Sequence, residues 1–134
     1  MDTLFLEGNA TIGIGNNDAV DTLYGNAGVA STLVADSGAD ILSVTGTAGT
    51  TLTGGAGADT FAFPNIMGQD EVTNFGIAKD TLQFNASLFA NFTAAMNAAS
   101  QSGANTVFTI DTNDTVTLDN VTKTSLTAGN FHFV

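Results

Sequence analysis

Large apolar residues recur along the first half of the chain at a constant spacing of 19 residues. The first series consists of the triplets Asp2-Thr3-Leu4, Asp21-Thr22-Leu23, Asp40-Ile41-Leu42 and Asp59-Thr60-Phe61. A second series, offset by about half a period, consists of Ile14, Leu33 and Leu52. Each period therefore holds two short segments, and each segment is predicted to point one apolar residue inward.

Glycine and small polar residues separate these segments. They form the runs Gly54-Gly55-Ala56-Gly57, Asp36-Ser37-Gly38 and Gly15-Asn16-Asn17-Asp18. Such residues tolerate the backbone conformations of tight corners. Short strands joined by corners at a fixed period predict a parallel β-solenoid, in which successive turns stack about 4.8 Å apart. A glycine-rich linker would have no reason to repeat an Asp at constant spacing.

The period stops after Phe63, and Pro64 marks the break. Alternating patterns predict strands over residues 69–75 and 79–84, and a hairpin over residues 106–110 and 115–118. Helical spacing predicts a helix over residues 87–102, ended by Gly103. The phenylalanines of this half are expected in a core that caps the solenoid: Phe75, Phe84, Phe89, Phe92 and Phe108. The chain is therefore predicted to be mainly β, with a solenoid over 1–63 and a β-rich cap containing one helix over 64–134.

Composition excludes several classes of function. The chain has 134 residues, with 2 Lys and Arg against 13 Asp and Glu, and a formal net charge of −11. It has no basic surface for nucleic acid or for anionic lipid. It has no cysteine, so thiolate metal sites are excluded. Its one histidine, His132, lies close to the C-terminus, and a histidine-based zinc site or catalytic triad is hard to build around it. No apolar run is long enough to span a bilayer, and the N-terminus lacks a cleavable signal pattern, so membrane insertion is not expected.

The aspartates of the first series would lie above one another in a stacked solenoid. Asp2, Asp21, Asp40 and Asp59 would form one column of carboxylates, and residues 1–78 contain no Lys or Arg to neutralise it. Like charges directly opposite each other destabilise a sheet. A divalent cation would remove the repulsion, and carboxylates with turn carbonyls suit Ca²⁺ better than Mg²⁺ or Zn²⁺.

One segment carries a specific resemblance. Residues 54–62, Gly-Gly-Ala-Gly-Ala-Asp-Thr-Phe-Ala, match every defined position of G-G-x-G-x-D-x-U-x, the Ca²⁺-binding nonapeptide of RTX proteins. The chain thus resembles the RTX (repeats-in-toxin), or hemolysin-type calcium-binding, family. The resemblance implies a parallel β-roll with Ca²⁺ in its corners, held by Asp carboxylates and glycine-loop carbonyls of adjacent turns.

By position, the resemblance makes Asp59 a carboxylate ligand, with Gly55 and Gly57 offering carbonyls. Asp40 with Gly38, within a corner that starts at Asp36, matches next best. Asp21, whose corner includes Asp18, keeps the carboxylate without the usual glycines, and Asp2 matches only through the Asp-Thr-Leu end of the motif. The alternative for any one Asp is a turn residue that accepts local hydrogen bonds.

The other half-turns depart from the motif. Those centred on Ile14, Leu33 and Leu52 carry Ile12, Ser31 and Thr50 where the motif has Asp. The sequence therefore predicts calcium along one edge of the solenoid only.

The second half resembles the non-repeat C-terminal region of RTX exoproteins. Residues 70–75, Asp-Glu-Val-Thr-Asn-Phe, resemble its D-x-I-x-D-F element, and residues 125–134 resemble its uncleaved secretion end, although Gly129-Asn130 replaces acidic residues common there. The resemblance implies export by type I (ABC transporter) machinery to the cell surface or the extracellular space. A chain that folds only when it binds Ca²⁺ outside the cell would be easy to thread through such a channel.

Three functional hypotheses follow. No nucleophile–base pair is visible, and nothing singles out a glycosidase pair among the carboxylates, so no enzyme activity is expected. The preferred hypothesis is a secreted structural protein that self-assembles with Ca²⁺ into a homo-oligomer or polymer, such as an extracellular filament, matrix or surface layer, because the repeat starts at Asp2 with no cargo before it. The alternative is a C-terminal folding and export module of a larger RTX enzyme or adhesin. Ice binding is disfavoured because Val20, Ala39 and Ala58 stand where a regular Asn array is needed.

Overall fold

The chain folds as a solenoid of two facing sheets that is closed at one end by a cap. The computed structural model describes residues 1–16, 20–65 and 67–134. Sheet A contains, in spatial order, β1 (Asp2–Phe5), β3 (Asp21–Tyr24), β5 (Ile41–Ser43), β7 (Thr60–Phe63), β9 (Thr81–Phe84) and β13 (Phe131–Phe133). Sheet B contains β10 (Ala99–Ser102), β11 (Asn105–Thr109), β12 (Thr115–Leu118), β8 (Gln69–Val72), β6 (Thr50–Thr53), β4 (Ser31–Val34) and β2 (Ile12–Ile14).

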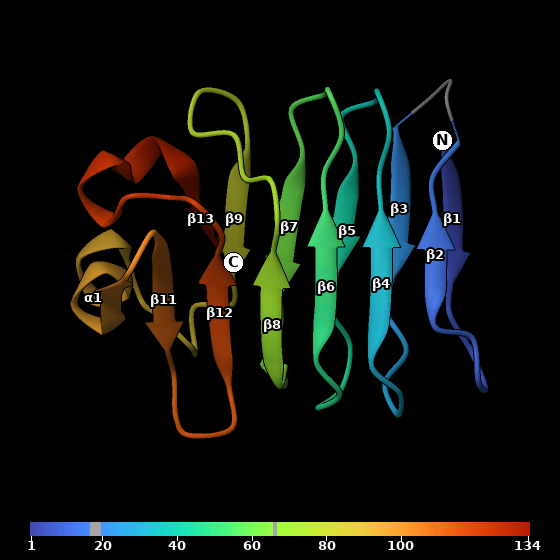
Figure 1. Ribbon diagram of the computed structural model, residues 1–134, viewed down its shortest axis with the longest axis horizontal. Helices are drawn as coiled ribbons and strands as arrows, with labels where there is room; N and C mark the ends of the chain where they lie inside the picture. The colour runs from blue at the N-terminus through green and yellow to red at the C-terminus, as the bar shows by residue number, and fades with distance from the viewer. Residues whose placement is uncertain (17–19, 66) are drawn as a thin grey trace.

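From β1 to β9 the chain alternates between the two sheets, so that each turn adds one strand to each (Figure 1). All strand pairs of sheet A are parallel, as are those that join β2, β4, β6, β8 and β12 in sheet B. The remaining pairs, β10–β11 and β11–β12, are antiparallel. The predicted fold class, a parallel β-solenoid followed by a β-rich cap with one helix, is confirmed.

Register places equivalent apolar residues directly above one another between the sheets. In sheet A, Leu23, Leu42, Phe61 and Leu82 are aligned in this way. In sheet B, the aligned residues are Leu33, Leu52, Val72 and Leu118. All eight side chains are completely buried, and burial of each stabilises the fold by about 1.5–3 kcal/mol. The 19-residue period predicts the part of these columns formed by Leu23, Leu42, Phe61, Leu33 and Leu52.

The stack continues beyond the last 19-residue repeat. Thr51 pairs with Glu71, a separation of 20 residues, and Thr60 pairs with Thr81, a separation of 21. Strands β8 and β9 therefore form another turn, although the corners that lead to them are longer. The division into regions 1–63 and 64–134 stays a prediction.

The first turn differs from the prediction that Ile14 points inward. Gly13 pairs with Leu33, whereas Ile12 and Ile14 are 63% and 66% exposed. A Cβ on Gly13 would lie 3.1 Å from Leu33 Cδ2 and 3.3 Å from Leu4 Cδ2, so leucine side chains already fill this part of the interior. Because side chains alternate along a strand, the shift of one residue turns both isoleucines outward.

The predicted helix over 87–102 is too long. Helix α1 spans Phe92–Ala98, begins at the N-cap Asn91, and gives way to β10 at Ala99. Strand β10 pairs with β11 through a two-residue turn in which Gly103 has a φ of 59°, as glycine does in tight hairpins. Gly103 therefore serves the hairpin and not the end of the helix. The predicted hairpin of residues 106–110 and 115–118 is confirmed as β11–β12.

A cluster of aromatic rings closes the C-terminal end of the solenoid. Phe84 contacts Phe89, Phe108 and Phe131, with ring centroids 5.0, 5.7 and 6.3 Å away. Four of the five phenylalanines predicted in the core are buried, and Phe92 is half-buried against Phe131. Helix α1 and two short 3₁₀ turns, η1 (Lys123–Ser125) and η2 (Ala128–Asn130), complete this cap. No helix in the described part of the chain is long and apolar enough to cross a membrane.

Candidate metal-binding edge

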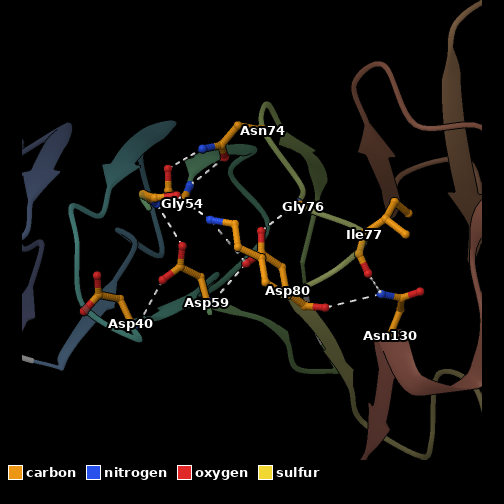
Figure 2. A network of polar contacts seen from close by, with 10 residues as sticks. Asp40, Gly54, Asp59, Asn74, Gly76, Ile77, Asp80 and Asn130 are labelled. Atoms are coloured by element: carbon orange, nitrogen blue, oxygen red, sulfur yellow. Dashed lines mark hydrogen bonds and ion pairs between the residues drawn. The ribbon is translucent and has the colours of Figure 1, made fainter. Parts of the chain in front are cut away.

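The aspartates of the repeat lie along the edge of the solenoid where the chain passes from sheet B to sheet A. We call this the aspartate edge; its corners are residues 35–40, 54–59, 73–80 and the described part of 15–20. The corners at the other edge, residues 6–11, 25–30, 44–49 and the described part of 64–68, form the opposite edge. Asp40, Asp59 and Asp80 follow one another in a row along the aspartate edge (Figure 2).

Four carboxylates of this edge form a ladder that we call the aspartate ladder: Asp21, Asp40, Asp59 and Asp80. Each is between 1% and 3% exposed. In each, Oδ1 accepts a hydrogen bond from the backbone N–H of the aspartate one turn earlier, namely Asp2, Asp21, Asp40 and Asp59, over 2.7–3.1 Å. The predicted column is present, and its carboxylates also hold consecutive turns together.

The second carboxylate oxygen closes the local corner. Oδ2 of Asp59 accepts the N–H of Gly55 at 2.8 Å, and Oδ2 of Asp80 accepts that of Gly76 at 2.7 Å. Asn16 donates to Asp21 in the same way at 2.9 Å. These bonds use two of the roughly four acceptor positions of an ionised carboxylate, so each aspartate retains lone pairs for a cation.

Asp40 differs from the other members of the ladder. Its Oδ2 is buried and has no hydrogen-bond partner among the described residues. Burial raises the pKa of Asp40, the hydrogen bond from the backbone N–H of Asp21 and the nearby backbone of Asp36 lower it, and the charges of Asp59 and Asp36 raise it. A buried carboxylate with an unpaired oxygen beside two further carboxylates is a position where bound positive charge stabilises the fold.

Glycines at the corners let the turns approach closely. A Cβ on Gly55 would lie 1.3 Å from the carbonyl oxygen of Asp36, and one on Gly57 would lie 1.4 Å from that of Gly38. The carbonyl of Asp36 also accepts the N–H of Ala56 at 2.7 Å. The glycines predicted as ligands therefore have a structural role, and they bring corner carbonyls of adjacent turns beside the aspartate ladder.

The remaining residues predicted as metal ligands are less favourably placed to bind a cation. The carboxylate of Asp36 accepts hydrogen bonds from the N–H groups of Ser37 and Gly38 in its own corner. Asp2 is exposed and accepts the side chain of Asn16 at 2.6 Å. Asp18 lies outside the described residues. No group of three or more Asp, Glu or His side chains in residues 1–16, 20–65 and 67–134 is arranged to hold a metal ion.

A lysine reaches the end of the aspartate ladder. Lys79 Nζ lies 4.0 Å from Asp80 Oδ1 and donates to the carbonyl of Gly55 at 2.8 Å. The Gly55 carbonyl, predicted as a calcium ligand, thus binds an ammonium group here. Lys79 and Lys123 are the only basic side chains besides His132, and Lys123 binds the carbonyl of Ala99. Within the described part of the chain, the rest of the ladder therefore has no lysine beside it.

Several residues of this edge were not predicted from the sequence. Asp80 was expected only in a strand, because its separation of 21 residues from Asp59 breaks the period; the triplet Asp80-Thr81-Leu82 repeats the sequence of residues 2–4 and was the available signal. Asn74 exchanges two hydrogen bonds with the backbone of Gly54, and Asn130 Nδ2 donates to the carbonyl of Ile77 at 2.8 Å (Figure 2). No local pattern predicts these contacts, since the residues that they join are 20 and 53 positions apart.

Several solved structures are similar to this chain, among them a lipase and a subunit of an epimerase. The extracellular lipase LipA from Serratia marcescens has 25% sequence identity and a TM-score of 0.58, over 99% of this chain and 19% of the lipase. The AlgE6R2 subunit of the mannuronan C5-epimerase from Azotobacter vinelandii has 22% identity and a TM-score of 0.59, over 93% of this chain and 92% of that subunit. No family model and no curated protein matches the sequence. The likeness supports the fold, and membership of the RTX family stays a prediction.

Proposed function

We propose that this chain is a non-catalytic, secreted β-roll protein whose aspartate edge binds Ca²⁺ and folds as it does so. The buried aspartate ladder supports this most directly, because four carboxylates share one nearby lysine among the described residues. Bound Ca²⁺ would supply the missing positive charge. Asp40, Asp59 and the corner carbonyls of Asp36 and Gly38 are the groups best placed to hold it, and all are hard oxygen donors.

Folding and ion binding are coupled in this proposal. Without cations, the chain must bury several carboxylates against their mutual repulsion, and the folded state is disfavoured. Ligands that bind only the folded state stabilise it by mass action. The same coupling suits a chain that crosses a type I channel unfolded and folds outside the cell, and the similar lipase is an extracellular protein.

Circular dichroism and amide NMR in EDTA and then in millimolar CaCl₂ test this proposal. We expect the β signal to increase with Ca²⁺, and Asp40→Asn to require more Ca²⁺ than the wild type for the same signal. Asp2→Asn is the matched control, because Asp2 occupies the exposed end of the same column. A wild-type chain that folds fully in EDTA and gives no heat of Ca²⁺ binding would contradict the proposal.

We further propose that the protein self-assembles through its first turn. Among the residues that the structure describes, strand β1 pairs only with β3, and β2 pairs only with β4. Met1, Phe5, Ile12 and Ile14 are 59–80% exposed there, beside a hollow of about 370 Å³ lined by Leu4, Ile14 and Leu23 among others. An unpaired strand edge with exposed apolar side chains favours association with another chain.

Light scattering in the presence of Ca²⁺ distinguishes self-assembly from the alternative (the module hypothesis), in which this chain is a folding and export module of a larger protein. Assemblies that disappear in Ile14→Thr, but remain in the control Val134→Thr at the other end of the chain, would support self-assembly. A wild-type mass that stays near 13.6 kDa would favour a folding and export module of a larger protein. The similar lipase supports the module hypothesis, because this chain covers 19% of it.

A further inference from the structure

The opposite edge also contains a buried carboxylate. Asp70, at the start of β8, is 2% exposed. Its Oδ1 accepts the N–H of Thr50 at 2.7 Å, the same bond to the preceding turn that the aspartate ladder makes. Its Oδ2 is buried and has no hydrogen-bond partner among the described residues. An ionised carboxylate in this position is unfavourable unless a positive charge or a proton is bound to it.

A second carboxylate reaches this corner from the β11–β12 hairpin. Asp114 Oδ1 accepts the N–H of Gly68 at 2.8 Å, which ties the hairpin to the corner before Asp70 although the two residues are 46 positions apart. The pKa of Asp70 is raised to about 7, mainly by burial; the Thr50 N–H lowers it and the nearby charge of Asp114 raises it. Asp114 is therefore close enough to Asp70 for the two charges to interact.

Backbone carbonyls and an open space accompany the two carboxylates. The corners of the opposite edge approach closely, since a Cβ on Gly49 would lie 2.5 Å from the carbonyl oxygen of Gln69, and one on Gly68 would lie 2.5 Å from that of Thr47. A surface hollow of about 580 Å³ is lined by Thr47, Gly49, Gln69 and Asn113. Gln69 and Asn113 are the chain neighbours of Asp70 and Asp114, although neither aspartate itself lines the hollow.

No basic side chain in the described part of the chain neutralises this pair. The chain has two Lys and Arg residues. Lys79 donates to the carbonyl of Gly55 on the aspartate edge, and Lys123 donates to the carbonyl of Ala99 in the cap. Two carboxylates with carbonyl and amide oxygens nearby are hard donors without strict geometry, which Ca²⁺ accepts more readily than Mg²⁺.

We propose that Asp70 and Asp114 bind a divalent cation of the Ca²⁺ class on the opposite edge, with carbonyl oxygens of the corners formed by residues 47–49 and 67–69. This site links the β11–β12 hairpin to the last turns of the solenoid. The site is distinct from the ion sites proposed for the aspartate edge, and its test does not depend on them.

Calorimetric Ca²⁺ titration of the full chain at about pH 8, above the pKa of Asp70, tests the proposal through the number of ions bound. Asp70→Asn and Asp114→Asn are each expected to bind one ion fewer than the wild type, and the double variant no fewer than either. Glu71→Gln is the matched control, because Glu71 is the next residue of β8 and is exposed, and it should leave the number unchanged. A folded Asp70→Asn variant with the wild-type number of ions would overturn the proposal.

A measurement on the wild type covers the case in which the variants fail to fold. Mn²⁺ added to Ca²⁺-loaded protein should broaden the amide NMR signals of Thr50 and Gly68, which are bonded to the two carboxylates. If these signals stay sharp while those of Gly55 and Ala56 broaden, only the aspartate edge binds and this proposal is wrong. If only Thr50 and Gly68 respond, the proposal stands and the proposed function of the aspartate edge fails.

Discussion

The two edges of the solenoid use different side chains to accept hydrogen bonds from the backbone N–H groups of their corners. On the aspartate edge, Asp21 binds both an N–H of its own corner and an N–H of the preceding turn. On the opposite edge, Ser31 occupies the corresponding position, and its hydroxyl accepts only the local N–H of Asn26, at 2.9 Å. A hydroxyl is short and has one oxygen, so it closes a corner without bridging two turns, whereas a carboxylate does both.

This difference shows how a carboxylate at this position both stabilises and destabilises the fold. Bridging turns through Asp Oδ1 provides an acceptor for a buried N–H that would otherwise be unsatisfied. Each bridge also buries a negative charge, and the charges accumulate along one edge. Asp70 is the place where the opposite edge adopts the carboxylate bridge, and it is also where a second cation site is proposed.

The largest expected effect on stability comes from a substitution at a corner of the aspartate edge. Gly55→Ala places a methyl group 1.3 Å from the carbonyl of Asp36, and because both are backbone positions the two turns must separate. We expect Gly55→Ala to fail to fold or to lose more than about 4 kcal/mol of stability. Thermal melts in Ca²⁺ measure this. Gly129→Ala is the control, because its nearest contact would be an ordinary 3.6 Å; equal losses for both variants would show that the close approach is unimportant.

Removal of a carboxylate bridge should have the next largest effect. Asp59→Ala leaves the N–H groups of Asp40 and Gly55 without their acceptor, at a cost of about 2 kcal/mol for each. Asp59→Asn retains one oxygen and should lose less. Urea unfolding in EDTA separates the bridge from any ion effect. If Asp59→Ala is as stable as Asp2→Ala, whose carboxylate accepts an exposed side-chain bond, the ladder does not hold the turns together.

The charge of Asp70 should make stability depend on pH. Because its pKa is raised from 3.8 to about 7 in the folded chain, the folded state holds a proton between these values that the unfolded state has lost. Stability in EDTA is therefore expected to fall as the pH rises from about 4 to about 7, by a few kcal/mol. Asp70→Asn should lack this component, and the difference between the two chemical denaturation profiles measures it. A difference that does not change with pH would contradict the assignment.

The smallest expected effect concerns the lysine at the end of the ladder. The Lys79 side chain is 37% exposed, and its ion pair with Asp80 spans 4.0 Å, so Lys79→Gln should cost less than about 1 kcal/mol in EDTA. The same variant frees the Gly55 carbonyl and adds one net negative charge to this edge. Calorimetry should therefore show tighter Ca²⁺ binding in Lys79→Gln, with Lys123→Gln in the cap as the control. Weaker binding would indicate that Lys79 positions the corner for the ion.

Local repetition predicted much of the solenoid and part of the site. Where spacing stayed at 19 residues, Leu23, Leu42 and Phe61 occupy the core as expected. Where a corner gained or lost a residue, the period misled, since Ile14 lies outside and Asp80 was missed as a member of the ladder. The repeat period gives only the number of residues per turn, whereas the register between strands depends on which side chains fit the interior.

The sequence alone determined the architecture of stacked turns, the single edge rich in aspartate and the scarcity of positive charge, because these depend on repeat spacing and composition. Only the tertiary structure decided which oxygens are satisfied. Asp40 is left with a buried unpaired oxygen, Lys79 reaches the Gly55 carbonyl, and Asp114 is brought from a distant hairpin to the corner of Asp70. The Lys79 contact joins the corners of adjacent turns 24 positions apart. The Asp114 contact spans 46 positions and exists because the β11–β12 hairpin folds back to extend sheet B, which no local pattern encodes.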